Sequence, residues 1–170
     1  MSATRPIIDA VQQHLQAALP HIGVDVFPER PGDYSLTHPV GVVLVGYQGS
    51  KFTRQEALGM IAQQRDVTLS LTIMGVGWHS DEGTLAILDE VRLAIVGYRP
   101  PNCQMCHLIH EQFLSEDAGA WQYELLVQTE TQQVQQITEP NLPKLTSVYT
   151  RQSTDPLNPD LTPSQNHPSP

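Results

Sequence analysis

The residues most able to do chemistry lie between positions 103 and 110. Cys103, Cys106 and His107 form a C-x-x-C-H pattern, in which two thiols can bond the vinyl groups of a haem and the histidine can ligate its iron. His110 adds a fourth side chain, and two thiolates with two imidazoles can complete a tetrahedral zinc shell. This stretch therefore raises the alternative of a haem- or zinc-binding module at Cys103–His110.

The expected local structure argues against such a module. The stretch runs into a strand in which Cys106 and His107 point to opposite faces, and His107 and His110 diverge as well. A thioredoxin-like C-x-x-C pair needs a helix N-terminus behind it, whereas Pro100 and Pro101 come before this one. We expect two reduced cysteines at the beginning of a strand, with no metal and no cofactor.

A second polar group, His79, Asp81 and Glu82, has side chains suited to acid–base chemistry or to a metal site. It comes directly before an apolar helix, where carboxylates accept hydrogen bonds from the free N–H groups of the first turn. No serine nucleophile elbow and no glycine-rich phosphate loop occur in the sequence. We interpret the group as helix capping and expect no enzymatic activity.

These polar groups flank the stretch from Asp66 to Pro101, around which the chain is organised. Apolar and polar residues alternate from Asp66 to Met74, which predicts a strand with one apolar face. The helix predicted from Gly83 to Val96 is so apolar that it needs cover beyond its own sheet. We assign four of its residues to the core or to contacts with another copy of the chain: Leu85, Leu88, Val91 and Ile95.

The remaining periodicities complete an α-β-β-β-α-β-β order. The other predicted elements are a helix at Pro6–Leu19, strands at Val24–Phe27, Val40–Tyr47 and Trp121–Thr129, a strand ending the stretch Cys103–Leu114, and a turn at Ser115–Gly119. Strands cluster instead of alternating strictly with helices, so the fold class is α+β. We expect a mainly antiparallel sheet with both helices packed on one face.

A long polar connection, Gln48–Gln64, joins two of the predicted strands. A connection of this length is either a protruding hairpin or a functional loop. Its tip carries Lys51, Phe52 and Arg54, an aromatic residue flanked by cations. We expect the tip to project and to contact a partner.

The composition changes after about Gln135, and we divide the chain into a domain at 1–137 and a proline-rich extended C-terminal arm at 138–170. From Gln135 onward the chain holds seven of the 14 prolines and too few large apolar residues for a core of its own. One interpretation is a disordered tail; the other is an arm whose segment Asn141–Pro159 lies extended across a neighbour. The anchors of such an arm are Leu142, Leu145, Val148, Tyr149 and Leu157.

The charge of the chain restricts its partners. Eighteen acidic and 9 basic residues give a net charge of −9, which argues against a dedicated nucleic-acid binder and against an anionic membrane surface. DNA can still slide past such a protein. An acidic run without basic residues fits either a solvated face or a negative lining that repels DNA: Glu111, Glu116, Asp117, Glu124 and Glu130. We find no membrane-spanning run and no secretory signal in Met1–Pro20, and expect a cytoplasmic chain.

Several segments, in their order and spacing, resemble a known family. They are Ile7–Ala10, Phe27-Pro28, Tyr34–Pro39, Val43–Ser50, Gln64-Arg65, Gly83–Pro100 and Gly119–Tyr123. Together the chain from about residue 6 to 130 resembles the phage Mu-type tail terminator family of contractile-tailed bacteriophages. The C-terminal arm lies outside this resemblance.

The resemblance implies a structural virion protein without catalytic residues. Its members form a hexameric ring at the head-proximal end of the tail, assembled in the host cytoplasm. The ring caps the tail tube and the tail sheath and joins the tail to the neck or connector protein, while DNA only passes through the lumen. Two further alternatives are a neck or head-completion protein and the cap of a tail-like contractile injection particle.

Overall fold

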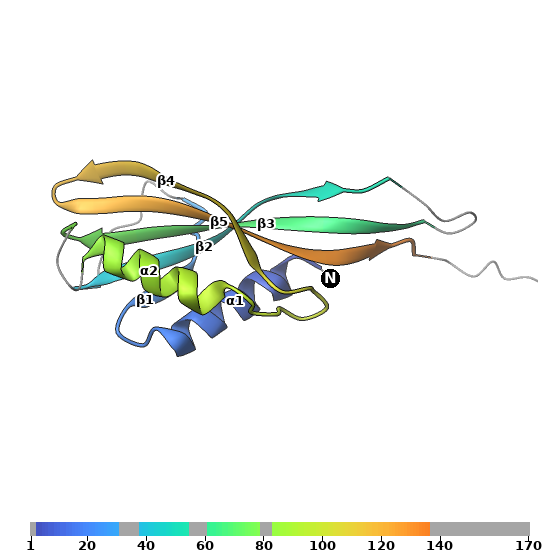
Figure 1. The fold of residues 1–170 in the computed structure, drawn as a ribbon, viewed down its shortest axis with the longest axis horizontal. Coiled ribbons are helices and arrows are strands. Elements are labelled where there is room, and N and C mark those ends of the chain that lie inside the picture. Colours follow the sequence, from blue (N-terminus) through green and yellow to red (C-terminus); the bar gives the residue numbers. More distant parts are fainter. Residues whose placement is uncertain (1–2, 31–37, 55–60, 79–82, 137–170) are drawn as a thin grey trace, which may run out of the picture. The chain divides into compact units, whose positions relative to one another are not determined.

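The computed structural model describes residues 3–30, 38–54, 61–78 and 83–136 (Figure 1). Its elements are α1 (Arg5–Ala18), β1 (Gly23–Val26), β2 (Gly41–Phe52), β3 (Ala62–Val76), α2 (Thr84–Ile95), β4 (His107–Asp117) and β5 (Ala120–Val134). The predicted α+β class and the α-β-β-β-α-β-β order are confirmed. The predicted C-terminal arm with its anchors, and the capping residues Asp81 and Glu82, lie outside the described residues.

The five strands form one sheet in the order β1-β2-β3-β5-β4. Three of the four neighbouring pairs are antiparallel, as expected, but β1 and β2 run parallel. Residues 27–40 connect these two strands. A connection of this length can return the chain to the end of the sheet from which β1 started, and a parallel pair requires such a crossover. The sheet is therefore mainly antiparallel with one parallel edge.

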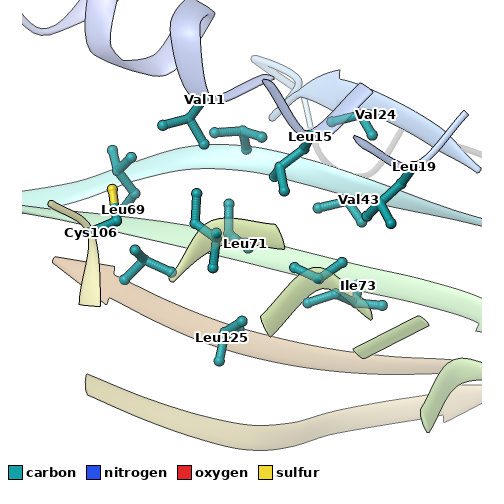
Figure 2. Packing of buried hydrophobic residues seen from close by; sticks show 14 of the residues in the cluster. Val11, Leu15, Leu19, Val24, Val43, Leu69, Leu71, Ile73, Cys106 and Leu125 are labelled. Carbon is teal, nitrogen blue, oxygen red and sulfur yellow. The ribbon is translucent and has the colours of Figure 1, made fainter. Parts of the chain in front are cut away.

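The alternation predicted for the central strand determines where the core lies. Val67, Leu69, Leu71 and Ile73 of β3 are completely buried on one face of the sheet. Both helices cover this face, hereafter the helix face, and their apolar residues belong to the same buried cluster (Figures 1 and 2). Burying each such side chain contributes roughly 1.5–3 kcal/mol. The prediction that both helices pack on one face is confirmed.

Two glycines let α2 approach the sheet closely. A Cβ atom on Gly75 would lie 2.7 Å from Thr84 Oγ1, and one on Gly41 would lie 2.6 Å from Ile87 Cδ1. Gly75 lies within β3, which continues to Val76. At the helix start, Gly83 is the N-cap residue, and Thr84 Oγ1 donates a hydrogen bond to the Gly77 carbonyl oxygen at 2.8 Å.

The strands are longer than their apolar runs indicate. β2 continues to Phe52, β3 begins at Ala62 and β5 continues to Val134, so that three strands project beyond both helices (Figure 1). We call residues 50–52, 62–66 and 130–134 the three-stranded extension. Of the two alternatives for Gln48–Gln64, the described residues form the protruding hairpin.

The β4–β5 hairpin also has a tighter turn than predicted. Strand pairing continues to Asp117 and Ala120, which leaves only Ala118 and Gly119 in the turn. Both residues have positive φ, 49° and 85°, as the two-residue hairpin turn that matches strand twist requires.

Candidate functional site

The two cysteines and the two neighbouring histidines face different environments. Cys103 and Cys106 are free thiols buried in the core, whereas His107 and His110 are exposed. Burial, with a smaller contribution from Cys103, raises the pKa of the Cys106 thiol to about 11. The thiolate that a zinc site requires is therefore disfavoured here.

One detail of the sequence argument at this segment was wrong. His107 lies opposite Gln128 and His110 lies opposite Leu126, so both histidines occupy the face of the sheet that the helices leave open. A register shift between Leu108 and His110 adds a residue to β4, and this bulge returns the second histidine to the face of the first. Among the described residues, no three His, Cys, Asp or Glu side chains gather as metal ligands would.

The predicted contact residues at the end of β2 are exposed but do not form one patch. Lys51 pairs with Asp66 on the open face, whereas Phe52 pairs with Arg65 on the helix face. Arg54 follows the strand and is exposed as well. A partner that contacts the end of β2 from one face of the sheet therefore meets either Lys51 or the ring of Phe52, but not both.

The four residues assigned on the second helix lie mostly inside the domain. Leu88, Val91 and Ile95 are buried in the core, and Leu85 packs against it in a partly buried position. The apolar residue of α2 that is available to a partner is Leu93, which is 83% exposed. In the part of the chain that the structure describes, no helix is long and apolar enough to cross a membrane.

The open face of the sheet carries polar residues on β3 and β5 and a small buried apolar cluster of Val42, Leu44 and Met74. Glu124 accepts hydrogen bonds from Ser70 Oγ at 2.8 Å and from Gln112 Nε2 at 2.7 Å. The acidic run is divided between the two faces, because Glu111 lies on the helix face and pairs with Arg92 at 2.9 Å. These residues therefore do not form a single negative lining within one copy.

An aromatic group covers one end of the helix face. Trp78 and Trp121 stack with ring centroids 4.8 Å apart, Phe113 lies 5.5 Å from Tyr123, and Trp78 Nε1 donates to Tyr123 Oη. Half of Phe113 and 38% of Trp78 remain exposed. The sequence analysis missed this group because Trp78 is distant in sequence from the other three; the alternation of Trp121 and Tyr123 is the signal that both share a face.

The opposite end of the helix face holds a buried cation. Arg65 is 7% exposed, and its guanidinium donates to Ser50 Oγ, Thr4 Oγ1 and Tyr47 Oη. Serine and arginine hydrogen bonds lower the pKa of Tyr47, against the opposing effect of its partial burial. The sequence analysis did not name Arg65 as a site residue, although its position continues the buried alternation of β3 by one step beyond Val67.

Comparisons with known proteins agree with this architecture. A family model described as Gp37 protein matches residues 11–151. Among solved structures, a chain from one described as the virion of a native gene transfer agent (GTA) particle is similar in fold, with a TM-score of 0.50 and 14% identity. The match covers 78% of this chain and 98% of that chain. No curated protein matches the sequence. At this identity the structural similarity concerns the fold.

Proposed function

The chain belongs to the Gp37 protein family, and from this premise we propose that it is a structural component of a phage-type virion. The observation that carries the proposal is the fold match to a chain of a gene transfer agent virion, which extends over 98% of that chain. A match of this extent makes the whole domain comparable, not only a common substructure. The role we propose is assembly, not catalysis.

Within the virion, we propose the role of tail terminator. The resemblance between residues 6 and 130 and the Mu-type family supports this assignment. A tube end offers unpaired subunit faces that recruit the next ring, so a terminator must bind that end and present no equivalent face above. The two ends of the helix face differ as such a role requires: one carries the aromatic group, and the other continues into the three-stranded extension.

We further propose a ring of six copies at the head-proximal end of the tail. Head-to-tail contacts between identical subunits close into a ring when their rotation closes. The partners in this account are the tail tube, the tail sheath and the neck protein. The net charge of −9 suits a lumen through which DNA passes without binding.

The contacts we propose for this ring are the end of β2 and the C-terminal arm. Lys51, Phe52 and Arg54 would contact the tube, the sheath or a neighbouring subunit, and Asn141–Pro159 would lie across a neighbour. A chain truncated after Thr138 tests the second contact, because the domain should stay folded while sedimentation shows weaker assembly. Wild-type assembly by the truncated chain would exclude the arm as a contact.

Immunogold electron microscopy of particles carrying a tagged copy of this chain tests the proposed location. The proposal predicts gold at one position per particle, where tail and head meet. Label along the whole tail, or on the capsid alone, would contradict the terminator role. Label at the head-distal tip would exclude it as well.

A further inference from the structure

Arg65 carries a buried positive charge whose nearby partners are neutral. Its Nε donates to Ser50 Oγ at 2.9 Å, and its Nη2 donates to Thr4 Oγ1 at 2.7 Å and to Tyr47 Oη at 3.4 Å. Every ion pair among the described residues involves other side chains. Hydroxyl groups satisfy N–H donors but do not neutralise a charge, and a buried charge without a counter-ion is costly.

One nitrogen of this guanidinium remains available. The hydrogen bonds above use Nε and Nη2, and no described residue bonds Nη1. Among the described residues, no buried side-chain nitrogen or oxygen lacks a partner, so Nη1 is accessible to solvent. Arg65 lines a pocket of about 400 Å³, and we infer that the accessible Nη1 faces this space.

The pocket has one cationic side chain and a mixed lining. It lies at the N-terminus of α1, whose first turn contains no acidic residue, so the helix dipole adds to the charge of Arg65. Amide and hydroxyl groups form one part of the lining and apolar carbons the other, and none of the lining residues is acidic. They are Ala3, Pro6, Ile7, Arg65, Pro101, Asn102, Thr131, Gln132 and Gln133.

We propose that this pocket binds a carboxylate carried by a protein side chain. Nη1 can donate a charge-assisted hydrogen bond to a carboxylate oxygen, and the amides of Asn102 and Gln133 offer further donors. The apolar carbons of Pro6 and Ile7 suit the methylene stem of an aspartate or glutamate. A doubly charged phosphate is a poorer match, because Arg65 is the one cation in the lining.

The site stands independently of the proposed virion role. The carboxylate comes from another copy of this chain or from a different protein, and both sources have the same chemistry. In either case its binding joins the partner to α1 and to the three-stranded extension at once, because Arg65 contacts both. The pocket then makes assembly sensitive to salt.

A carboxylate introduced into the pocket lining by substitution tests the proposal on the purified full chain. Gln133→Glu places an acid on the pocket lining, on the face that Arg65 occupies, and should raise the thermal unfolding midpoint by about 4 °C at low salt. The gain should disappear in the double variant with Arg65→Met, and Gln13→Glu on the exposed side of α1 serves as the matched control. An unchanged or lowered midpoint in Gln133→Glu would overturn the proposal.

A direct binding measurement covers the case in which Arg65→Met does not fold. In wild-type protein, N-acetyl-glutamate N-methylamide should shift the amide NMR signals of Asn102, Thr131 and Gln132, and the matching glutamine amide should not. These shifts should be lost in Gln133→Glu, whose pocket is already occupied. Equal shifts with the glutamine amide, or shifts with inorganic phosphate alone, would overturn the carboxylate assignment.

Sedimentation then identifies the source of the carboxylate. If self-association of the purified wild-type chain falls in Gln133→Glu, whose resident acid competes for the pocket, another copy supplies the carboxylate. If self-association is unchanged while the wild-type pocket binds the glutamate probe, a different protein supplies it. Both results support the site. Absence of binding contradicts it and leaves the terminator proposal untouched.

Discussion

Tyr98 stacks on His14 with ring centroids 3.8 Å apart and planes within 8° of parallel. The contact joins the segment after α2 to the middle of α1. Two hydrogen bonds reinforce it: Tyr98 Oη donates to the Ala10 carbonyl at 3.1 Å, and His14 Nε2 donates to the Ala94 carbonyl at 2.8 Å. The two helices are thus joined to each other as well as to the sheet.

Two substitutions at Tyr98 separate the contribution of the ring to stability from that of its hydroxyl group. Tyr98→Phe keeps the stack and removes one hydrogen bond, so it should lower the free energy of unfolding by about 1 kcal/mol. Tyr98→Leu also removes the ring contact and should cost roughly 0.5–1.5 kcal/mol more. Urea unfolding measures both. Equal losses in the two variants would show that the stack contributes nothing.

Much of this architecture follows from the sequence because apolar and polar residues alternate regularly in β3. Val67 to Ile73 alternate without interruption, and all four apolar side chains are buried as predicted. The helix ends follow from proline and glycine, to within a residue or two. Periodicity of this kind is local, so it needs no knowledge of partners in space.

Other features depend on pairing that local patterns do not contain. The polar residues Gln63 and Gln64 have no apolar alternation, yet β5 provides Gln133 and Gln132 as their ladder partners and makes them strand. The bulge in β4 returns His110 to the face of His107, which a strict period of two excludes. The Arg65 network joins β3 to Thr4 at the start of α1 and to Tyr47 and Ser50 of β2.

Two leucines test the assignment of buried and exposed apolar surface. Leu71 is completely buried in β3, and Leu71→Ala should destabilise the domain by about 2–5 kcal/mol. Leu93 is 83% exposed on α2, and the same substitution there should change the free energy of unfolding by less than about 0.5 kcal/mol. Chemical denaturation compares the two. A large loss from Leu93→Ala would place that residue in the core.

The β4–β5 turn offers a stabilising change. Ala118 adopts a left-handed conformation at φ 49°, which costs an alanine roughly 1–2 kcal/mol. Ala118→Gly or Ala118→Asn should therefore raise the thermal midpoint, whereas Gly119→Ala should lower it. A Cβ at Gly119 meets no atom within 4 Å, so that loss is conformational and not steric. Stabilisation by Gly119→Ala would contradict the turn geometry.

The buried thiol of Cys106 makes stability depend on alkaline pH. The pKa of this thiol is about 11 in the folded chain, against an ordinary value of 9.0. The folded state therefore keeps the thiol proton to a higher pH than the unfolded state does. This contribution is fully present below pH 9 and is lost as the pH rises from 9 through 11. It amounts to about 3 kcal/mol.

Cys106→Ala provides the control for that pH dependence. The variant should be less stable at pH 8 because it loses packing, but its stability should fall less steeply between pH 9 and 11. Unfolding free energies measured in urea across this range decide the point. Parallel pH profiles for the variant and the wild type would exclude Cys106 as the cause.

The length of tails assembled without this chain tests the central claim most directly. Electron microscopy of particles from a host that lacks the chain measures tail length and the fraction of tails joined to heads. The terminator account predicts tails of variable, extended length that are not joined to heads, with normal particles restored by the wild-type chain. Tails of uniform, normal length joined to filled heads would contradict it.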